Sequence, residues 1–151
     1  MALHPIYKIR KAKISDLEFI HKSIISIYQT IIGLNDFEGI LKKKINSSDH
    51  HIFILEDHSI SLEYAGLLIA TTSQHLIDMW PTIEILDIFI MPKYRKLGAA
   101  DFLYNYLEGF AKVKKAFKLK VSCKINSTLN QSFYTHRGFR INQKQYTKPV
   151  Y

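Results

Sequence analysis

The sequence predicts a single α+β domain over residues 1–151, with a mixed, mostly antiparallel sheet and helices on both of its faces. Strand-like and helix-like segments alternate through the middle of the chain, which is the pattern of a sheet covered by helices. Two apolar runs joined by a polar turn, Ile52–Leu55 and Leu62–Thr72, indicate a hairpin. The 151 residues, 47% of them hydrophobic, suit one domain with a substantial core.

The N-terminal part of the chain predicts a strand over residues 6–13 followed by a helix. The segment Ser15–Glu18, Ser-Asp-Leu-Glu, fits a capping box in which serine and glutamate bond to each other's free N–H groups. Apolar residues at spacings of three and four then continue the helix, and Gly33 is its predicted stop. A shorter helix is expected over residues 37–45, before the hairpin.

The C-terminal part predicts a strand over Ile83–Met91, which follows a loop with Trp80 and Pro81. A helix begins at Gly98, and its expected core face consists of apolar residues at helical spacing: Ala99, Leu103, Tyr106, Phe110, Val113 and Phe117. A strand over Leu119–Ile125 and a short helix over 128–136 come next. The alternating residues that remain predict two closing strands, 138–142 and 145–150.

Composition excludes several classes of protein. No stretch approaches the ~18 apolar residues of a membrane span, and the start of the chain lacks the features of a signal peptide, so we expect a cytoplasmic protein with no membrane partner. The single cysteine, Cys123, is expected to be a buried packing thiol. The seven histidines show no spacing of a metal site, and no metal is predicted.

Residues 87–100 form the most informative stretch, because a strand-like run is followed by a basic turn that opens an amphipathic helix. The first N–H groups of a helix have no intrahelical partner and carry partial positive charge, so they bind anions. Gly98 keeps the backbone accessible, and Arg95 and Lys96 add charge. Neither G-x-G-x-x-G nor G-x-x-x-x-G-K-S/T occurs here. The turn therefore indicates a phosphate-bearing cofactor other than a dinucleotide or a nucleoside triphosphate.

Three short segments resemble the GNAT family of N-acetyltransferases. Arg95–Ala100 fits the family signature R/Q-x-x-G-x-G/A, and Ser132–Phe139 is similar to the F-Y-x-x-x-G-F segment that ends the same fold. Near the N-terminus, Ile9–Ala12 followed by Asp16-Leu17 is similar to the opening strand and helix of many members. The resemblance covers about residues 7–141, with the segments in the family's order.

The resemblance implies acetyl-CoA as the cofactor, bound by its pyrophosphate on the Arg95–Ala100 turn, and the net charge of +8 suits this polyanion. The implied cofactor-binding residues are Ile88, Phe89, Ile90, Arg95, Lys96, Leu97, Gly98, Ala99, Ala100, Asp101, Asn126, Ser127 and Asn130. The family often has asparagine where this chain has Ser127. Helix capping is therefore an alternative role for Asn126 and Ser127. The N–H of Ile90 is the implied donor to the thioester oxygen.

The reaction that the resemblance implies requires two proton transfers, one from the attacking amine and one to the departing thiolate. An alkylammonium with a pKa of ~10.4 is only about a thousandth neutral at pH 7, so a base is needed. Glu84 and Asp87 are the candidates, and three residues apart on a strand they point to opposite faces unless a bulge intervenes. Glu84 matches the glutamate of the family's histone-acetylating branch, and the alternative is a strand carboxylate with no role. Asp87 matches a family acid that is more often structural.

The departing thiolate needs a proton, and Tyr134 is the candidate donor. In the F-Y-x-x-x-G-F segment of the resembled family the tyrosine commonly acts as the general acid. A phenol with an ordinary pKa of ~10 can protonate a thiolate of ~8.5 when the two atoms are in reach. The alternative is an aromatic side chain that only packs the last helix.

We therefore expect an acetyl-CoA-dependent N-acetyltransferase in which an amine attacks the thioester directly. Residues 86–91, with Tyr94 and Arg95 following, are similar to the polyamine-acetylating branch, so a small amine or polyamine is the leading acceptor. A protein or peptide amine and an aminoglycoside are the other acceptors considered. The rival functions are a non-catalytic acyl-CoA-binding domain and a basic nucleic-acid-binding module, and no nucleic-acid motif accompanies the charge. A homodimer is left open.

Overall fold

The computed structural model describes residues 4–124 and 126–151. The chain forms two compact units, one up to Val121 and one from Ser122 to Tyr151. The elements, in chain order, are β1 (Tyr7–Lys11), the 3-10 turn η1 (Ile14–Asp16), α1 (Leu17–Tyr28), α2 (Leu34–Ile45), β2 (His50–Asp57), β3 (Glu63–Ser73), β4 (Thr82–Ile90), η2 (Pro92–Tyr94), α3 (Ala99–Val113), β5 (Lys118–Val121) and α4 (Thr128–Thr135).

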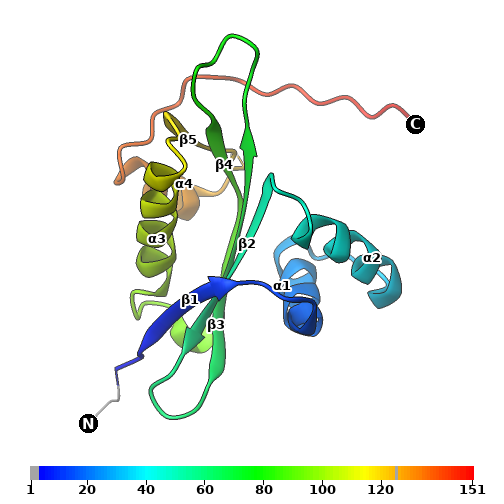
Figure 1. Ribbon diagram of the computed structural model, residues 1–151, viewed down its shortest axis with the longest axis vertical. Helices are drawn as coiled ribbons and strands as arrows, with labels where there is room; N and C mark the ends of the chain where they lie inside the picture. Colours follow the sequence, from blue (N-terminus) through cyan, green and yellow to red (C-terminus); the bar gives the residue numbers. More distant parts are fainter. Residues whose placement is uncertain (1–3, 125) are drawn as a thin grey trace. The chain divides into compact units, whose positions relative to one another are not determined.

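The first unit contains a five-stranded sheet in the order β1-β2-β3-β4-β5. The pairs from β1 to β4 are antiparallel, whereas β4 and β5 are parallel, so the predicted mixed, mostly antiparallel sheet is confirmed. Figure 1 shows α1 and α2 on one side of this sheet and α3 on the other. The predicted hairpin is formed by β2 and β3.

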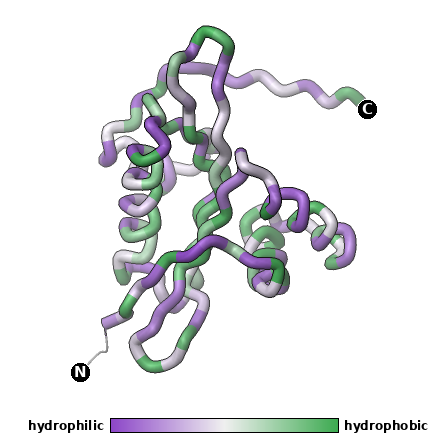
Figure 2. The backbone as a smooth tube through the Cα atoms, in the orientation of Figure 1, coloured by the Kyte–Doolittle hydropathy of each residue, from purple (hydrophilic) through white to green (hydrophobic). Residues whose placement is uncertain are grey.

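Strand β2 lies at the centre of the core and is buried on both faces. Its Ile52 and Ile54 pack in one cluster with Ile20 of α1 and with Phe37 of α2. Phe53, which alternates with them and is fully buried, contacts the rings of Tyr106 and Phe110 on α3. Because successive side chains of a strand point to opposite faces, one strand supports both helical layers. Figure 2 shows the hydrophobic residues concentrated in these central strands.

The first helix begins and ends differently from the prediction. The predicted capping box is absent, since α1 starts at Leu17 and the Asp16 carboxylate accepts the Lys13 N–H at 2.7 Å. The helix ends at Tyr28 because Gln29 turns into the left-handed region, with φ of 50°. Gly33 is not the stop: its φ is −62° and it directly precedes α2.

The predicted core face of α3 is confirmed in part. Ala99 and Leu103 are buried as expected, and the buried face then continues through Tyr104, Leu107 and Ala111. Val113 is 79% exposed at the end of the helix, and Phe117 lies beyond it. Tyr106 and Phe110 border this buried face, since their rings contact Phe53 of β2. The predicted stripe advances by about 3.6 residues per turn and so follows one face, but the buried face is centred to one side of it, toward Tyr104, Leu107 and Ala111.

Among the described residues of the second unit there is one regular element, α4, close to its predicted position. The structure describes all of 138–151 and forms no strand there, so the two closing strands were wrong. An alternating pattern becomes a strand only where a neighbouring strand takes up its backbone hydrogen bonds. The predicted strand 119–125 is the shorter β5, and Ile125 lies outside the described residues. Cys123 is half-buried rather than buried, and burial raises the pKa of its thiol.

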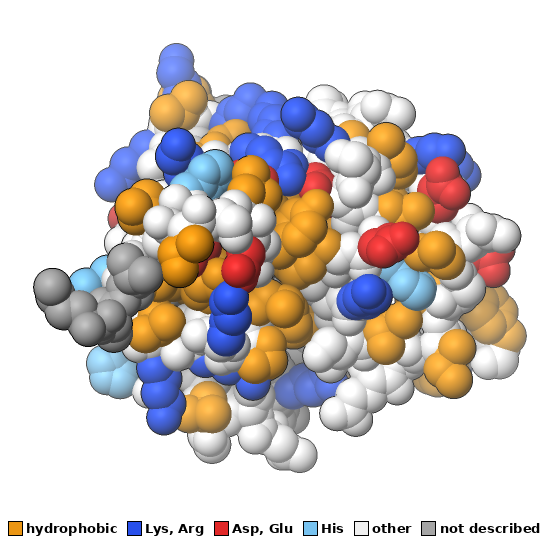
Figure 3. Space-filling model, turned by 90° about the horizontal axis from the view of Figure 1, so that it is seen from below, with side chains coloured by type: hydrophobic (Ala, Val, Ile, Leu, Met, Phe, Trp, Pro, Cys, Tyr) orange, Lys and Arg blue, Asp and Glu red, His pale blue; other side chains and the backbone are white. Residues whose placement is uncertain are grey.

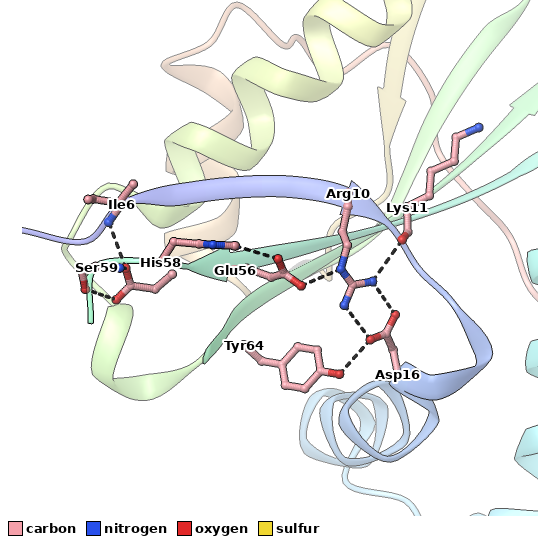
Figure 4. Close-up of polar contacts among 9 residues, drawn as sticks. Ile6, Arg10, Lys11, Asp16, Glu56, His58, Ser59 and Tyr64 are labelled. Atoms are coloured by element: carbon pink, nitrogen blue, oxygen red, sulfur yellow. Dashed lines mark hydrogen bonds and ion pairs between the residues drawn. The ribbon is translucent and has the colours of Figure 1, made fainter. Parts of the chain in front are cut away.

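A polar network ties the start of α1 to the sheet (Figure 4). The guanidinium of Arg10, on β1, donates to both carboxylate oxygens of Asp16, each at 2.8 Å, and to Glu56 of β2 at 2.5 Å. The Tyr64 hydroxyl of β3 donates to Asp16 at 2.8 Å. Burial by itself raises the pKa of Asp16, but the hydrogen bonds from Arg10, the Lys13 N–H and Tyr64 outweigh it and lower the pKa.

We expect Asp16→Asn to lower the free energy of unfolding by about 2 kcal/mol, because the buried carboxylate loses its charge while Arg10 keeps its own. Urea denaturation at pH 7 measures this change in the free energy of unfolding, with the exposed Asp36→Asn as a control that should stay within about 0.5 kcal/mol of wild type.

The effect of Asp16 should depend on pH. A folded-state pKa below the unfolded value means that Asp16 stabilises the folded protein above about pH 4 and that this contribution is lost on acidification. The difference between wild type and Asp16→Asn should therefore shrink as the pH falls. A difference that is the same at pH 7 and pH 3 would contradict this account.

Candidate functional site

The turn between β4 and α3 has the conformation of an anion cradle. Gly98 precedes α3 with φ of 78°, in the left-handed region, which glycine adopts without strain. The first intrahelical bond runs from the Phe102 N–H to the Gly98 carbonyl, so the N–H groups of Gly98, Ala99 and Ala100 come before it. A Cβ on Gly98 would meet no protein atom within 4 Å. Open space therefore faces the backbone where a ligand must approach.

Strand β4 offers an open backbone edge next to this turn. It pairs with β3 as far as Ile90, whereas within the described residues its pairing with β5 runs only from Thr82 to Ile85. The Met91 N–H donates to Ala65 of β3, so strand alternation directs the N–H and carbonyl of Ile90 to the other edge. The Arg95 Nε does reach this Ile90 carbonyl, at 3.3 Å. An extended ligand with amide groups can bind along this edge.

A β-bulge at Leu86 changes the expected arrangement of the two acidic candidates. The register passes from Ile69 opposite Asp87 to Ala70 opposite Ile85, so Leu86 is an extra residue. Glu84 lies opposite Thr71 and Asp87 opposite Ile69. Because Ile69 and Thr71 are two apart on β3, both carboxylates lie on one face of the sheet. The expectation of opposite faces was therefore wrong, and the bulge is the reason.

The shared face is the one covered by α1, which supplies Tyr28, a residue that is not among the predicted site residues. The Tyr28 hydroxyl donates to Asp87 at 2.6 Å. Burial raises the pKa of Asp87, and the Tyr28 hydrogen bond reduces this effect without cancelling it. Burial and the Asp87 carboxylate raise the pKa of Tyr28 to about 12. Glu84 lies 3.9 Å from the Lys120 ammonium of β5.

Four of the predicted site residues belong to the second unit: Tyr134, Asn126, Ser127 and Asn130. Tyr134, on α4, is 9% exposed, and its ring meets Phe133 and Phe139 edge to face. The packing role considered for this tyrosine is therefore present, and its proposed chemical role concerns only the hydroxyl. Among the described residues Ser127 precedes α4 without a side-chain capping bond, and Asn126 and Asn130 are exposed.

The other predicted residues lie in the first unit. Asp101 stands in the first turn of α3, where a carboxylate complements the helix dipole, and Arg95, Lys96 and Leu97 are exposed on the turn. Within residues 4–124 and 126–151, no group of three or more His, Cys, Asp and Glu side chains could hold a metal ion. No helix in the part of the chain that the structure describes is long and apolar enough to cross a membrane.

A helix start with free N–H groups beside an open strand edge suits a long, phosphate-bearing cofactor in extended form. The family model of the acetyltransferase (GNAT) family matches residues 25–139, and the chain belongs to this family. The family uses acetyl-CoA as its acyl donor, so the protein is an acetyl-CoA-dependent N-acetyltransferase. A comparison with curated protein sequences found no significant match.

Solved structures share the fold. The crystal structure of a probable acetyltransferase has a TM-score of 0.82 at 20% identity, covering 95% of this chain and 98% of that one. Aminoglycoside N-acetyltransferase AAC(6')-Iy in complex with CoA has a TM-score of 0.80 at 14% identity, covering 99% and 97%. The aminoglycoside 6'-N-acetyltransferase AAC(6')-Ih from Acinetobacter baumannii has a TM-score of 0.79 at 15% identity, covering 97% and 99%.

Proposed function

We propose that the protein acetylates the primary amine of a small cationic molecule, with a diamine or polyamine as the leading acceptor class. The observation that carries this proposal is the Leu86 bulge, which brings Glu84 and Asp87 to one face of β4, with Asp87 beyond the part of the strand that pairs with β5. Two carboxylates attract ammonium groups at short range, although the chain as a whole carries +8. Two of the three solved structures described above are named aminoglycoside acetyltransferases, and aminoglycosides are likewise small molecules with several amines.

The cofactor fits the residues of the first unit. The N–H groups of Gly98, Ala99 and Ala100 would hold the pyrophosphate, and the N–H groups of Ile88 and Ile90 would bond to the amide arm along β4. Figure 3 shows Lys and Arg side chains gathered along one edge of the face that it draws, with a few acidic ones between them. The net charge of +8 favours a polyanion. When bound, acetyl-CoA supplies the thioester carbonyl carbon that the amine attacks.

In this proposal the protein moves two protons and stabilises one developing charge. Asp87 takes the proton of the ammonium, because burial raises its pKa toward a value useful for a base. Tyr28 holds that carboxylate in place, and Glu84 attracts the cationic acceptor. The Ile90 N–H donates toward the oxygen on which negative charge develops. The hydroxyl of Tyr134 gives a proton to the sulfur.

Thiol release with acetyl-CoA and a panel of amines tests this proposal, with CoA binding measured in parallel by calorimetry. We expect turnover with a diamine, a polyamine or an aminoglycoside that exceeds turnover with a lysine-containing peptide. CoA binding without thiol release from any amine would instead identify a non-catalytic acyl-CoA-binding domain. A preference for the peptide would move the acceptor class to protein amines.

We expect Gly98→Val to weaken CoA binding more than tenfold, which corresponds to about 1.4 kcal/mol. A β-branched residue is strained at φ of 78°, and its side chain would occupy the open space through which the pyrophosphate reaches the backbone. Gly109→Val, at another exposed glycine of α3 whose Cβ meets nothing within 4 Å, is the matched control and should leave CoA affinity unchanged. Equal affinity of a folded Gly98→Val protein would remove the cradle from the proposal.

A further inference from the structure

The turn between β4 and α3 is anchored by hydrogen bonds and an ion pair to side chains of other elements in the first unit. The hydroxyl of Tyr94, at the end of η2, lies 3.1 Å from a carboxylate oxygen of Asp57 and 3.1 Å from one of Glu63. The Lys93 ammonium pairs with the same Glu63. Further along the turn, the Tyr7 hydroxyl of β1 donates to the Leu97 carbonyl at 3.2 Å. The turn is thereby tied to β1 and to both ends of the β2–β3 connection.

The central acceptor of this arrangement is a rigid, buried carboxylate. Asp57 is 7% exposed and accepts the N–H groups of Ile6 and Ser59, each at 2.9 Å, and the Ser59 hydroxyl at 3.0 Å. Figure 4 shows Ile6, just before β1, close to Ser59, just after β2. Tyr94 is 3% exposed, so its hydroxyl has little water to replace the carboxylate. A buried hydroxyl that loses its partner carries the full cost of desolvation.

The segment that follows Tyr94 needs such support because its backbone is unusual. Lys96 has φ of 63° and Gly98 has φ of 78°, so two of three successive residues are left-handed, and one of them is not glycine. A non-glycine residue in this region is disfavoured unless its surroundings hold it there. Residues 95–98 are all exposed, so little burial of their own side chains supports this backbone. The side-chain bonds that anchor the segment include those of Tyr94 to Asp57 and Glu63, of Tyr7 to the Leu97 carbonyl and of Arg95 to the Ile90 carbonyl.

We propose that Tyr94 and Asp57 are positioning residues that keep the acetyl-CoA turn in its binding conformation before the cofactor arrives. This inference rests on the proposed role of the turn in holding the pyrophosphate. A turn that is formed in advance binds without a further ordering cost, whereas a turn formed only part of the time lowers the apparent affinity by the fraction formed. We call the hydrogen bonds of Tyr94 to Asp57 and Glu63 the tether. In this proposal the tether contacts neither the thioester nor the amine, so it acts on cofactor binding rather than on the chemical step.

The test is Tyr94→Phe, which keeps the ring and removes only the hydroxyl. The Kd for CoA, measured by calorimetry, and the KM for acetyl-CoA should both rise about fivefold, while kcat at saturating acetyl-CoA stays within about twofold. Backbone hydrogen exchange over residues 96–100, measured without CoA, should become faster. Hydrogen exchange reports directly on the conformation of the turn, and the measurement does not depend on enzyme activity.

Tyr104→Phe is the matched control, because Tyr104 is also a buried tyrosine, 4% exposed, on the adjoining helix α3. It should destabilise the protein without changing CoA affinity or exchange in the turn. Equal CoA affinity and unchanged exchange in Tyr94→Phe would overturn the tether while leaving the proposed function standing. A wild-type protein that does not bind CoA would instead overturn the proposed function itself.

Should Tyr94→Phe fail to fold, Ser59→Ala takes its place. It removes one hydroxyl from the Asp57 carboxylate, and we expect a smaller rise in the Kd for CoA, about twofold, with faster exchange over residues 96–100. An unchanged Kd in that variant would overturn the tether.

Discussion

Asp87→Asn is expected to slow acetyl transfer at pH 7 by about 10²-fold, with part of the rate restored as the pH rises. At pH 7 only about a thousandth of an alkylamine with a pKa near ~10.4 is neutral, and the variant has no base at this position to remove the proton. As the pH approaches the pKa of the amine, the neutral form becomes abundant without help. The measurement is kcat/KM for the amine between pH 6 and 10, in conditions where chemistry is rate-limiting.

Glu84→Gln is the matched comparison, because the Leu86 bulge puts Glu84 on the same face as Asp87. We expect it to raise the KM for a cationic acceptor with a smaller and pH-independent loss of kcat, since its proposed role is attraction. The opposite pattern, with recovery at high pH in Glu84→Gln alone, would exchange the two roles. Loss that is equal at every pH in both variants would show that neither carboxylate is the base.

Tyr134→Phe is expected to lower kcat by about 10²-fold, at the low end of the range for general acid catalysis, because a thiolate is already a tolerable leaving group. The ring packs edge to face with Phe133 and Phe139, and phenylalanine preserves these contacts. The Kd for acetyl-CoA should change little, since the hydroxyl acts mainly as the C–S bond breaks. Steady-state kinetics and calorimetry on the same preparation separate the two quantities.

Tyr146→Phe, at an 88% exposed tyrosine of the same unit, is the control for loss of a hydroxyl and should behave as wild type. Should Tyr134→Phe turn over at nearly the wild-type rate while chemistry is rate-limiting, Tyr134 serves only in packing. A Tyr134→Phe variant that loses rate and unfolds at a much lower temperature would likewise assign the hydroxyl to structure.

Local patterns were sufficient where an element depends on its own residues. The apolar run of β4 was predicted as 83–91 and spans Thr82–Ile90, and the hairpin of β2 and β3 followed from two apolar runs around a polar turn. The Gly98 turn was predicted because a basic, glycine-containing segment opens an amphipathic helix, and the structure adds that Gly98 is left-handed. The closing strands at 138–150 failed because alternation describes one strand, whereas a strand forms only as a pair.

The sequence by itself determined the class of fold, the family and the turn that fits the pyrophosphate, because these depend on periodicity and on short contiguous motifs. Only the tertiary structure decided how the acidic residues are arranged. The Leu86 bulge is a shift in the pairing of β4 with β3. The residues of β4 alone do not specify how the two strands pair. The partners of Asp87 and Tyr94 were also decided there, since Tyr28 is 59 residues from Asp87 and Asp57 is 37 residues from Tyr94 along the chain. Such contacts arise when separate elements pack together, and a local sequence pattern carries no record of that packing.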